Sequence, residues 1–126
     1  MKVSFEPVNH LLINYHNTLA DIAEIVAEVD SPALGILADT FHMNIEETSM
    51  TEPLLKYGSL INHFHVADSN RWAPGRGHID FAAVFAVLRQ IGYQGWITVE
   101  SDPKPDYATM ARESYATLMR LLGRQV

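Results

Sequence analysis

The sequence of 126 residues contains no cysteine, which excludes a disulfide framework and any metal site built on thiolates. A metal ion would have to be held by histidine and carboxylate side chains, so the common structural zinc sites are excluded. The chain also lacks any apolar run near the roughly 18 residues that a membrane-spanning helix needs. Its first residues turn polar too soon for a signal peptide. We therefore expect a cytoplasmic protein without a membrane partner.

Runs of like charge are also missing. Charged residues make up 19% of the chain, 48% is hydrophobic, and the net charge is −6. This composition does not favour disorder, and an acidic chain is repelled by a polyanion, so we expect no nucleic-acid partner. The length suits one domain over residues 1–126.

Short apolar stretches alternate with helical patterns along the whole chain. Strands are expected at about residues 2–6, 34–39, 60–66 and 95–100. Helices are expected at about 17–29, at about 51–57 with Gly58 as its end, after a cap at Asp80, and at about 106–122. Four consecutive βα units predict an α/β fold with a parallel sheet and right-handed crossovers.

Each predicted strand ends in a residue that can bind a metal ion, namely Glu6, Asp39, His65 and Glu100. The carboxyl ends of parallel strands meet at one rim, which in a βα barrel carries the active site. We therefore expect the four side chains to converge. Three carboxylates and one imidazole suit Mn²⁺, Mg²⁺ or Co²⁺, and Zn²⁺ is a further candidate.

Each of these residues taken alone has a structural alternative. Asp39 could cap a helix that starts at Thr40, His65 could be a core histidine, and Glu100 could lie in an exposed turn. Their coincidence on one rim favours the metal site. His63 lies two residues before His65 and points to the same face of its strand.

Two further polar residues lie near the predicted rim. His42 follows Asp39 closely enough to share the cavity, and Arg71 lies in the loop after His65. Arginine suits oxygen-rich ligands, although His42 and Arg71 could equally be solvated loop residues. The segment Pro74-Gly75-Arg76-Gly77 lacks the lysine of a Walker phosphate loop.

Four segments together resemble the xylose-isomerase-like TIM-barrel superfamily. They are Phe5-Glu6-Pro7-Val8-Asn9, Asp39-Thr40-Phe41-His42-Met43-Asn44, His63-Phe64-His65-Val66-Ala67-Asp68-Ser69-Asn70-Arg71, and Pro74-Gly75-Arg76-Gly77-His78-Ile79-Asp80-Phe81, with Val99-Glu100 in the final strand. The nearest branch comprises ketose 3-epimerases together with hydroxypyruvate and sugar-phosphate isomerases. The sequence departs from the ketose epimerases at His10, where they carry arginine, and at Leu12, where they carry a second glutamate.

The resemblance implies a sugar isomerase or epimerase that transfers a proton α to a carbonyl through a metal-stabilised enediolate. It implies one divalent cation, with Mn²⁺ as the expected ion, held by Glu6, Asp39, His65 and Glu100. Glu6 and Glu100 are also implied to be the catalytic acid and base. The implied contacts to the sugar or sugar-derived carbonyl substrate are Asn9, His42, His63 and Arg71.

The family's barrel has eight βα units, and the chain is expected to match its C-terminal half. Open sheet edges favour pairing, so we expect a homodimer or association with a missing N-terminal half. Three other functions stay open. The chain could be an inactive half barrel or assembly module, an inosose-dehydratase-like lyase, or an abasic-site endonuclease, which the net charge disfavours.

Overall fold

The computed structural model describes residues 1–123 and places one parallel sheet at the centre of the chain. Its strands are β1 (Val3–Phe5), β2 (Leu34–Asp39), β3 (Ile61–Val66) and β4 (Trp96–Val99), hydrogen-bonded in that order. The helices are α1 (Leu19–Val29), α2 (Thr40–Glu46), α3 (Glu52–Tyr57), a 3₁₀ turn at Gly58–Leu60, α4 (Phe81–Gln90) and α5 (Tyr107–Leu121). Each strand pairs parallel with the next, which confirms the predicted α/β class.

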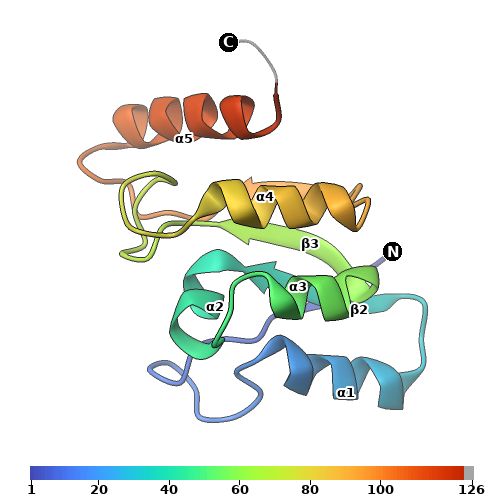
Figure 1. Ribbon diagram of the computed structural model, residues 1–126. Coiled ribbons are helices and arrows are strands. Elements are labelled where there is room, and N and C mark those ends of the chain that lie inside the picture. The colour runs from blue at the N-terminus through green and yellow to red at the C-terminus, as the bar shows by residue number, and fades with distance from the viewer. Residues whose placement is uncertain (124–126) are drawn as a thin grey trace.

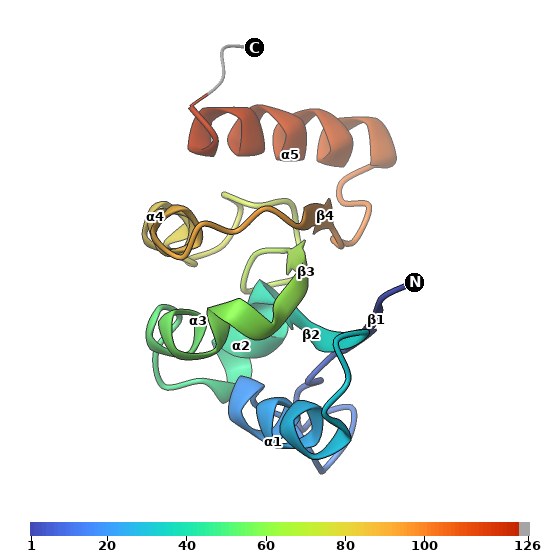
Figure 2. The ribbon, with the colours of Figure 1, turned by 90° about the vertical axis from the view of Figure 1, so that its right-hand side faces the viewer.

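The helices lie along the outer face of the sheet, as Figures 1 and 2 show. The core forms between this face and the helices. The opposite face is open: Trp96 lies on it, opposite His63 in the register, and remains 79% exposed. Within residues 1–123 no helix is long and apolar enough to cross a membrane. The buried core comprises Leu19, Ile22, Val26, Ile36, Ala38, Met43, Leu54, Ile61, Phe64, Val66, Phe81, Val84, Phe85, Val87 and Leu88.

Local sequence explains where most helices begin. Thr18 and Asp21 form a reciprocal capping box at the start of α1, and Asp80 and Asp106 each accept a backbone N–H in the first turn of α4 and α5. Helix α2 was considered in the sequence only as an alternative role for Asp39, as the cap of a helix that starts at Thr40, and the structure contains this helix. Its cap is Asp39, whose Oδ1 accepts the N–H of Phe41 at 2.7 Å.

Gly58 does not end α3 in the way that the sequence suggested. A terminating glycine usually adopts positive φ, whereas Gly58 has φ −55° and ψ −34° and the chain continues into the 3₁₀ turn. Glycine is needed there for packing, since a Cβ would lie 2.6 Å from Cδ1 of Ile91.

An irregularity between β2 and β3 sets which side chains reach the rim. The register shifts between Ile36 and Leu37, so that Leu37 pairs with His63 and Asp39 pairs with His65. Paired residues in parallel strands share a face of the sheet. The shift therefore carries His63 and His65 onto the face that Asp39 occupies.

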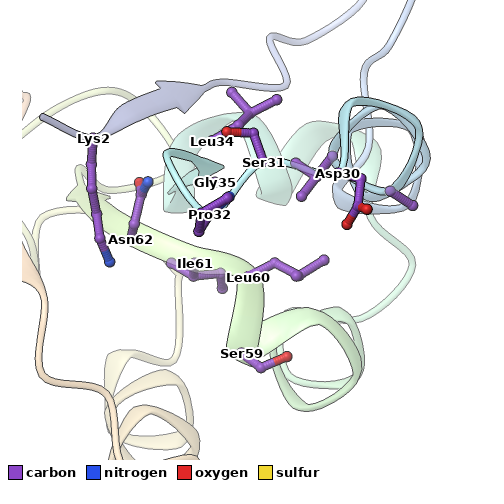
Figure 3. Close-up of a pocket in the computed structure, with 12 residues that line it drawn as sticks. Lys2, Asp30, Ser31, Pro32, Leu34, Gly35, Ser59, Leu60, Ile61 and Asn62 are labelled. Carbon is purple, nitrogen blue, oxygen red and sulfur yellow. The ribbon is translucent and has the colours of Figure 1, made fainter.

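A surface depression lies at the opposite end of the strands (Figure 3). It has a volume of about 470 Å³ and is lined in part by Lys2, Pro32, Leu60 and Asn62. The side chain of Asn62 crosses Gly35 to bond Ser4 and the carbonyl of Val3. At this end of the sheet, these hydrogen bonds connect β1 and β3 across β2. Among the described residues, the cluster of titratable side chains lies at the other end, where the strands finish.

Candidate metal centre

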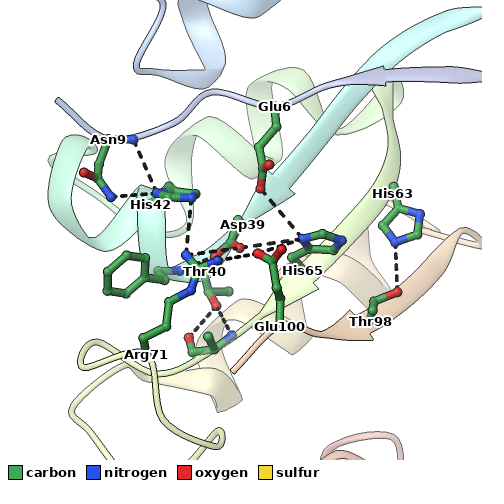
Figure 4. Close-up of polar contacts among 12 residues, drawn as sticks. Glu6, Asn9, Asp39, Thr40, His42, His63, His65, Arg71, Thr98 and Glu100 are labelled. Atoms are coloured by element: carbon green, nitrogen blue, oxygen red, sulfur yellow. Dashed lines mark hydrogen bonds and ion pairs between the residues drawn. The ribbon is translucent and has the colours of Figure 1, made fainter. Parts of the chain in front are cut away.

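The four predicted metal ligands lie together at the carboxyl ends of the strands (Figure 4). Asp39 is the last residue of β2, and Glu6 and Glu100 directly follow β1 and β4. His65 is the penultimate residue of β3. One ligand atom from each residue lies within 4.8 Å of the others. Parallel pairing brings the strand ends to one rim, and the register shift between β2 and β3 places His65 on the same face as Asp39.

Nδ1 of His65 lies at the centre of the cluster. It is 3.3 Å from Glu100 Oε2 and 3.7 Å from both Glu6 Oε1 and Asp39 Oδ2. Two of these distances are too long for hydrogen bonds. Glu6 Oε1, Asp39 Oδ2 and His65 Nδ1 are buried and have no hydrogen-bond partner. Buried polar atoms are nearly always paired, so three unpaired atoms that face one point fit a bound cation.

Asp39 combines two roles through its two oxygens. Oδ1 caps α2, and Oδ2 faces the cluster. The side chain is fully buried, and burial alone would raise the pKa of Asp39. Neighbouring His65 and Arg71 outweigh that effect and hold the pKa below its usual value. The helix-cap interpretation and the metal-ligand interpretation of this residue are therefore compatible.

The metal-free cluster is electrostatically unfavourable. Burial raises the pKa of Glu6 to about 7, and the charges of Asp39 and Glu100 add to this effect. The pKa of His65 is also raised, first by the carboxylate of Asp39. Both shifts show that the cluster favours added positive charge. A divalent cation would supply that charge without a proton.

Arg71 borders the cluster from the loop after β3. Its guanidinium donates to Glu100 Oε2 at 2.5 Å and lies 4.6 Å from the ring centroid of Phe41. The backbone of Arg71 has φ +64°, a conformation that costs energy for a residue with a Cβ. The carboxylate of Asp68 organises the loop by accepting the N–H groups of Ser69, Gly75 and Ile79.

His42 projects from α2 toward the same rim. Its Nε2 lies 3.3 Å from Arg71 Nη1, and burial lowers its pKa. Asn9 lies behind it: the side chain is 1% exposed and its Nδ2 lies 2.7 Å from His42 Nδ1. Its side chain contacts His42, and the expected contact of Asn9 with substrate stays a prediction.

His63 lies next to the cluster on the same face, with its ring centroid 5.0 Å from that of His65. Its Nε2 is 2.9 Å from Thr98 Oγ1 on β4. The sequence analysis missed two supporting residues. Phe41 stacks under Arg71, and Thr40 joins α2 to the end of β3 through hydrogen bonds with Ala67. Neither could be recognised without the spatial arrangement.

Comparison with known proteins places this geometry in context. A family model described as xylose isomerase-like TIM barrel matches residues 1–121. The chain is 38% identical over 117 residues to 3-dehydro-D-guloside 4-epimerase of Escherichia coli, covering 92% of this chain and 45% of that protein. The crystal structure of D-allulose 3-epimerase from Methylomonas in complex with D-allulose matches with a TM-score of 0.79 and 33% identity, over 90% of this chain and 41% of that one.

A third match bears on the metal. The crystal structure of the IOLI protein with a binding zinc atom has a TM-score of 0.79 and 25% identity, over 96% of this chain and 49% of that one. The chain thus spans less than half the length of the curated relative and of both solved structures. The four-unit fold corresponds to about half of a TIM barrel.

Proposed function

We propose that this chain, which belongs to the xylose isomerase-like TIM barrel family, carries the metal centre and the catalytic carboxylates of a sugar epimerase or isomerase. The observation that supports this most is the set of three buried, unpaired atoms on Glu6, Asp39 and His65, all facing one point. That the chain corresponds to the C-terminal half of the barrel stays a prediction.

The proposed ligands are Glu6, Asp39, His65 through Nδ1, and Glu100. Three oxygens and one nitrogen suit Mn²⁺ best, and Mg²⁺, Co²⁺ or Zn²⁺ fit the same donors. When bound, the cation supplies Lewis-acid stabilisation of negative charge that develops on substrate oxygens. The bound zinc of the IOLI protein supports a divalent ion in this family.

The two glutamates would move the proton. Glu6 and Glu100 each present a carboxylate at the cluster, and a carboxylate held beside the reacting carbon can accept a proton and return it. One carboxylate would take the proton from the carbon α to a carbonyl, leaving an enediolate. Return to the opposite face of that carbon gives an epimer, and return to the neighbouring carbon gives an isomer.

The proposed substrate is a sugar or sugar-derived carbonyl compound. His42 and Arg71 present nitrogen donors beside the cluster and would orient its oxygens. His63 lies farther along the strand, bonded to Thr98, and would contact the substrate only from that side. Two of the similar proteins, 3-dehydro-D-guloside 4-epimerase and D-allulose 3-epimerase, are sugar epimerases by their names, which supports this substrate class.

Turnover is proposed to need the rest of a barrel, supplied by a second copy or by an N-terminal half. Strands β1 and β4 are both sheet edges, and the inner face exposes Trp96. Exposed edges and apolar residues favour such pairing. Mass measurement in solution tests the second-copy arrangement: a dimer supports it, and a monomer at working concentration counts against it.

The test of the proposed function separates binding from chemistry. Calorimetric titration with Mn²⁺ should show one site per chain, and Asp39→Asn should weaken binding at least 10-fold. The assembled protein should exchange the α-hydrogen of a ketose with solvent deuterium, and Glu6→Gln and Glu100→Gln should each abolish exchange.

Glu47→Gln is the matched control, because Glu47 is a partly buried carboxylate that bonds Leu19 and lies outside the cluster. It should leave both metal binding and exchange intact. Exchange that persists undiminished in both cluster variants would rule out the proposed acid and base.

A further inference from the structure

Asn9 holds His42 in an arrangement that restricts where its ring proton can reside. Both the backbone N–H of Asn9, at 3.3 Å, and its side-chain Nδ2, at 2.7 Å, approach Nδ1 of His42 (Figure 4). A backbone N–H can only donate. Both contacts are satisfied when Nδ1 accepts, the shorter one from Nδ2 being the stronger, and in a neutral imidazole the proton then lies on Nε2.

The orientation of the Asn9 amide is fixed from its other end. Oδ1 of Asn9 accepts the backbone N–H of Leu11 at 3.1 Å. If the amide were flipped, its NH₂ group would face that N–H and two donors would meet. Amide orientation is assigned from such networks, and this network allows only the form in which Nδ2 donates to His42.

The opposite ring nitrogen meets a second donor. Nη1 of Arg71 lies 3.3 Å from Nε2 of His42, and a guanidinium can only donate. With its proton on Nε2, His42 cannot accept from Arg71. Two donors therefore face each other at the border of the cluster, and an oxygen acceptor lying beside both would satisfy them.

We propose that Asn9 is a positioning residue that fixes the Nε2–H tautomer of His42, so that His42 and Arg71 form a paired donor site for a carbonyl or hydroxyl oxygen. Since Nε2 carries a proton, His42 in this tautomer serves neither as a metal ligand nor as a base through that atom. This inference rests on the proposed function for the identity of the ligand, but not for the tautomer itself.

Long-range ¹H–¹⁵N correlation spectra of ¹⁵N-histidine-labelled, metal-free protein test the proposal. The signals of His42 are identified by their absence in His42→Gln. The wild-type protein should show a protonated Nε2 and an unprotonated Nδ1 at neutral pH. A protonated Nδ1 and bare Nε2 in the wild type overturns the proposal, whatever the variants do.

Asn9→Asp supplies the reciprocal test, because a carboxylate beside Nδ1 accepts rather than donates. The charged carboxylate at the shorter, 2.7 Å contact should outweigh the backbone N–H at 3.3 Å, so that Nδ1 carries a proton. Asn17→Ala is the matched control: Asn17 ties the same loop through the carbonyls of Val8 and Ile13 and is bonded to no histidine. It should keep the Nε2–H form. An unchanged tautomer in a folded Asn9→Asp protein, or a changed one in Asn17→Ala, overturns the proposal.

The spectra need neither metal nor substrate, so they decide the tautomer even if no epimerase activity is found. In the active assembly, Asn9→Asp should lower kcat/KM at least 10-fold without loss of Mn²⁺ binding. Equal loss in Asn17→Ala would assign the effect to loop order and count against a positioning role for Asn9.

Discussion

Replacing Glu6 with glutamine should stabilise the metal-free protein while weakening its binding to metal. The pKa of Glu6 rises from 4.5 to about 7 in the fold, because the carboxyl is buried and faces Asp39 and Glu100. A carboxyl whose pKa is higher in the folded state destabilises the fold once it ionises. The penalty begins as pH rises through 4.5 and is complete above about 7. A shift of this size corresponds to about 3 kcal/mol.

Urea unfolding in the presence of a chelator measures this effect. At pH 8 the Glu6→Gln protein should be about 3 kcal/mol more stable than the wild type, and at pH 4 the two should coincide. His65, whose pKa is also raised, stabilises the fold at low pH and loses that effect as pH rises through its folded pKa. Glu6 contributes to the raised pKa of His65, so the difference between the two proteins measures Glu6 together with its interaction with His65.

Added Mn²⁺ should narrow this difference. The wild type at a metal concentration 100 times its Kd should gain about 2.7 kcal/mol, and the variant, lacking one ligand, should gain less. The control Glu47→Gln should gain the same stability from Mn²⁺, relative to chelator, as the wild type does. Equal stability of the wild type and Glu6→Gln at pH 8 without metal would refute the electrostatic account of the cluster.

Three further predictions concern the loop that carries Arg71. Asp68→Asn should lower the free energy of unfolding by about 1–3 kcal/mol at pH 7. Burial opposes ionisation of Asp68, but backbone N–H groups hold its pKa below 3.8. Its contribution to stability should therefore be lost as pH falls through the pKa of the folded state, which urea unfolding at a series of pH values measures. Gly77→Ala should destabilise by about 1–3 kcal/mol, because a Cβ would lie 2.3 Å from Asp68 Oδ1; an unchanged urea midpoint would contradict this. Arg71→Gly should be about 1 kcal/mol more stable than Arg71→Ala, since φ is +64°, and equal midpoints would show that no strain is stored there.

The sequence was sufficient to predict the rim. Glu6, Asp39, His65 and Glu100 each lie at or next to the end of an apolar strand, and parallel topology brings such ends to one rim. The predicted strand bounds agree with the structure to within one residue, as for 60–66 against Ile61–Val66. These features depend on short-range patterns, which a single sequence carries.

Features that depend on pairing could not be predicted. The register shift at Ile36 and Leu37 is decided by how two strands fit together, and it leaves no mark in either strand's own pattern. The contact between Asn9 and His42 is non-local in the same way, since 33 positions separate the two residues along the chain. The packing of Gly58 against Ile91 is equally non-local.

Metal binding and turnover should be separable in this chain. All four proposed ligands come from β1 to β4 or the residues that directly follow them, and the core that holds these strands lies on the helix side of the sheet. The cluster therefore needs no other strand to form. A substrate pocket has a different requirement, because the inner face is open at Trp96 and β1 and β4 are unpaired edges. A monomer should thus bind one cation but should not exchange substrate hydrogen with solvent. Exchange should appear only when a partner covers the inner face.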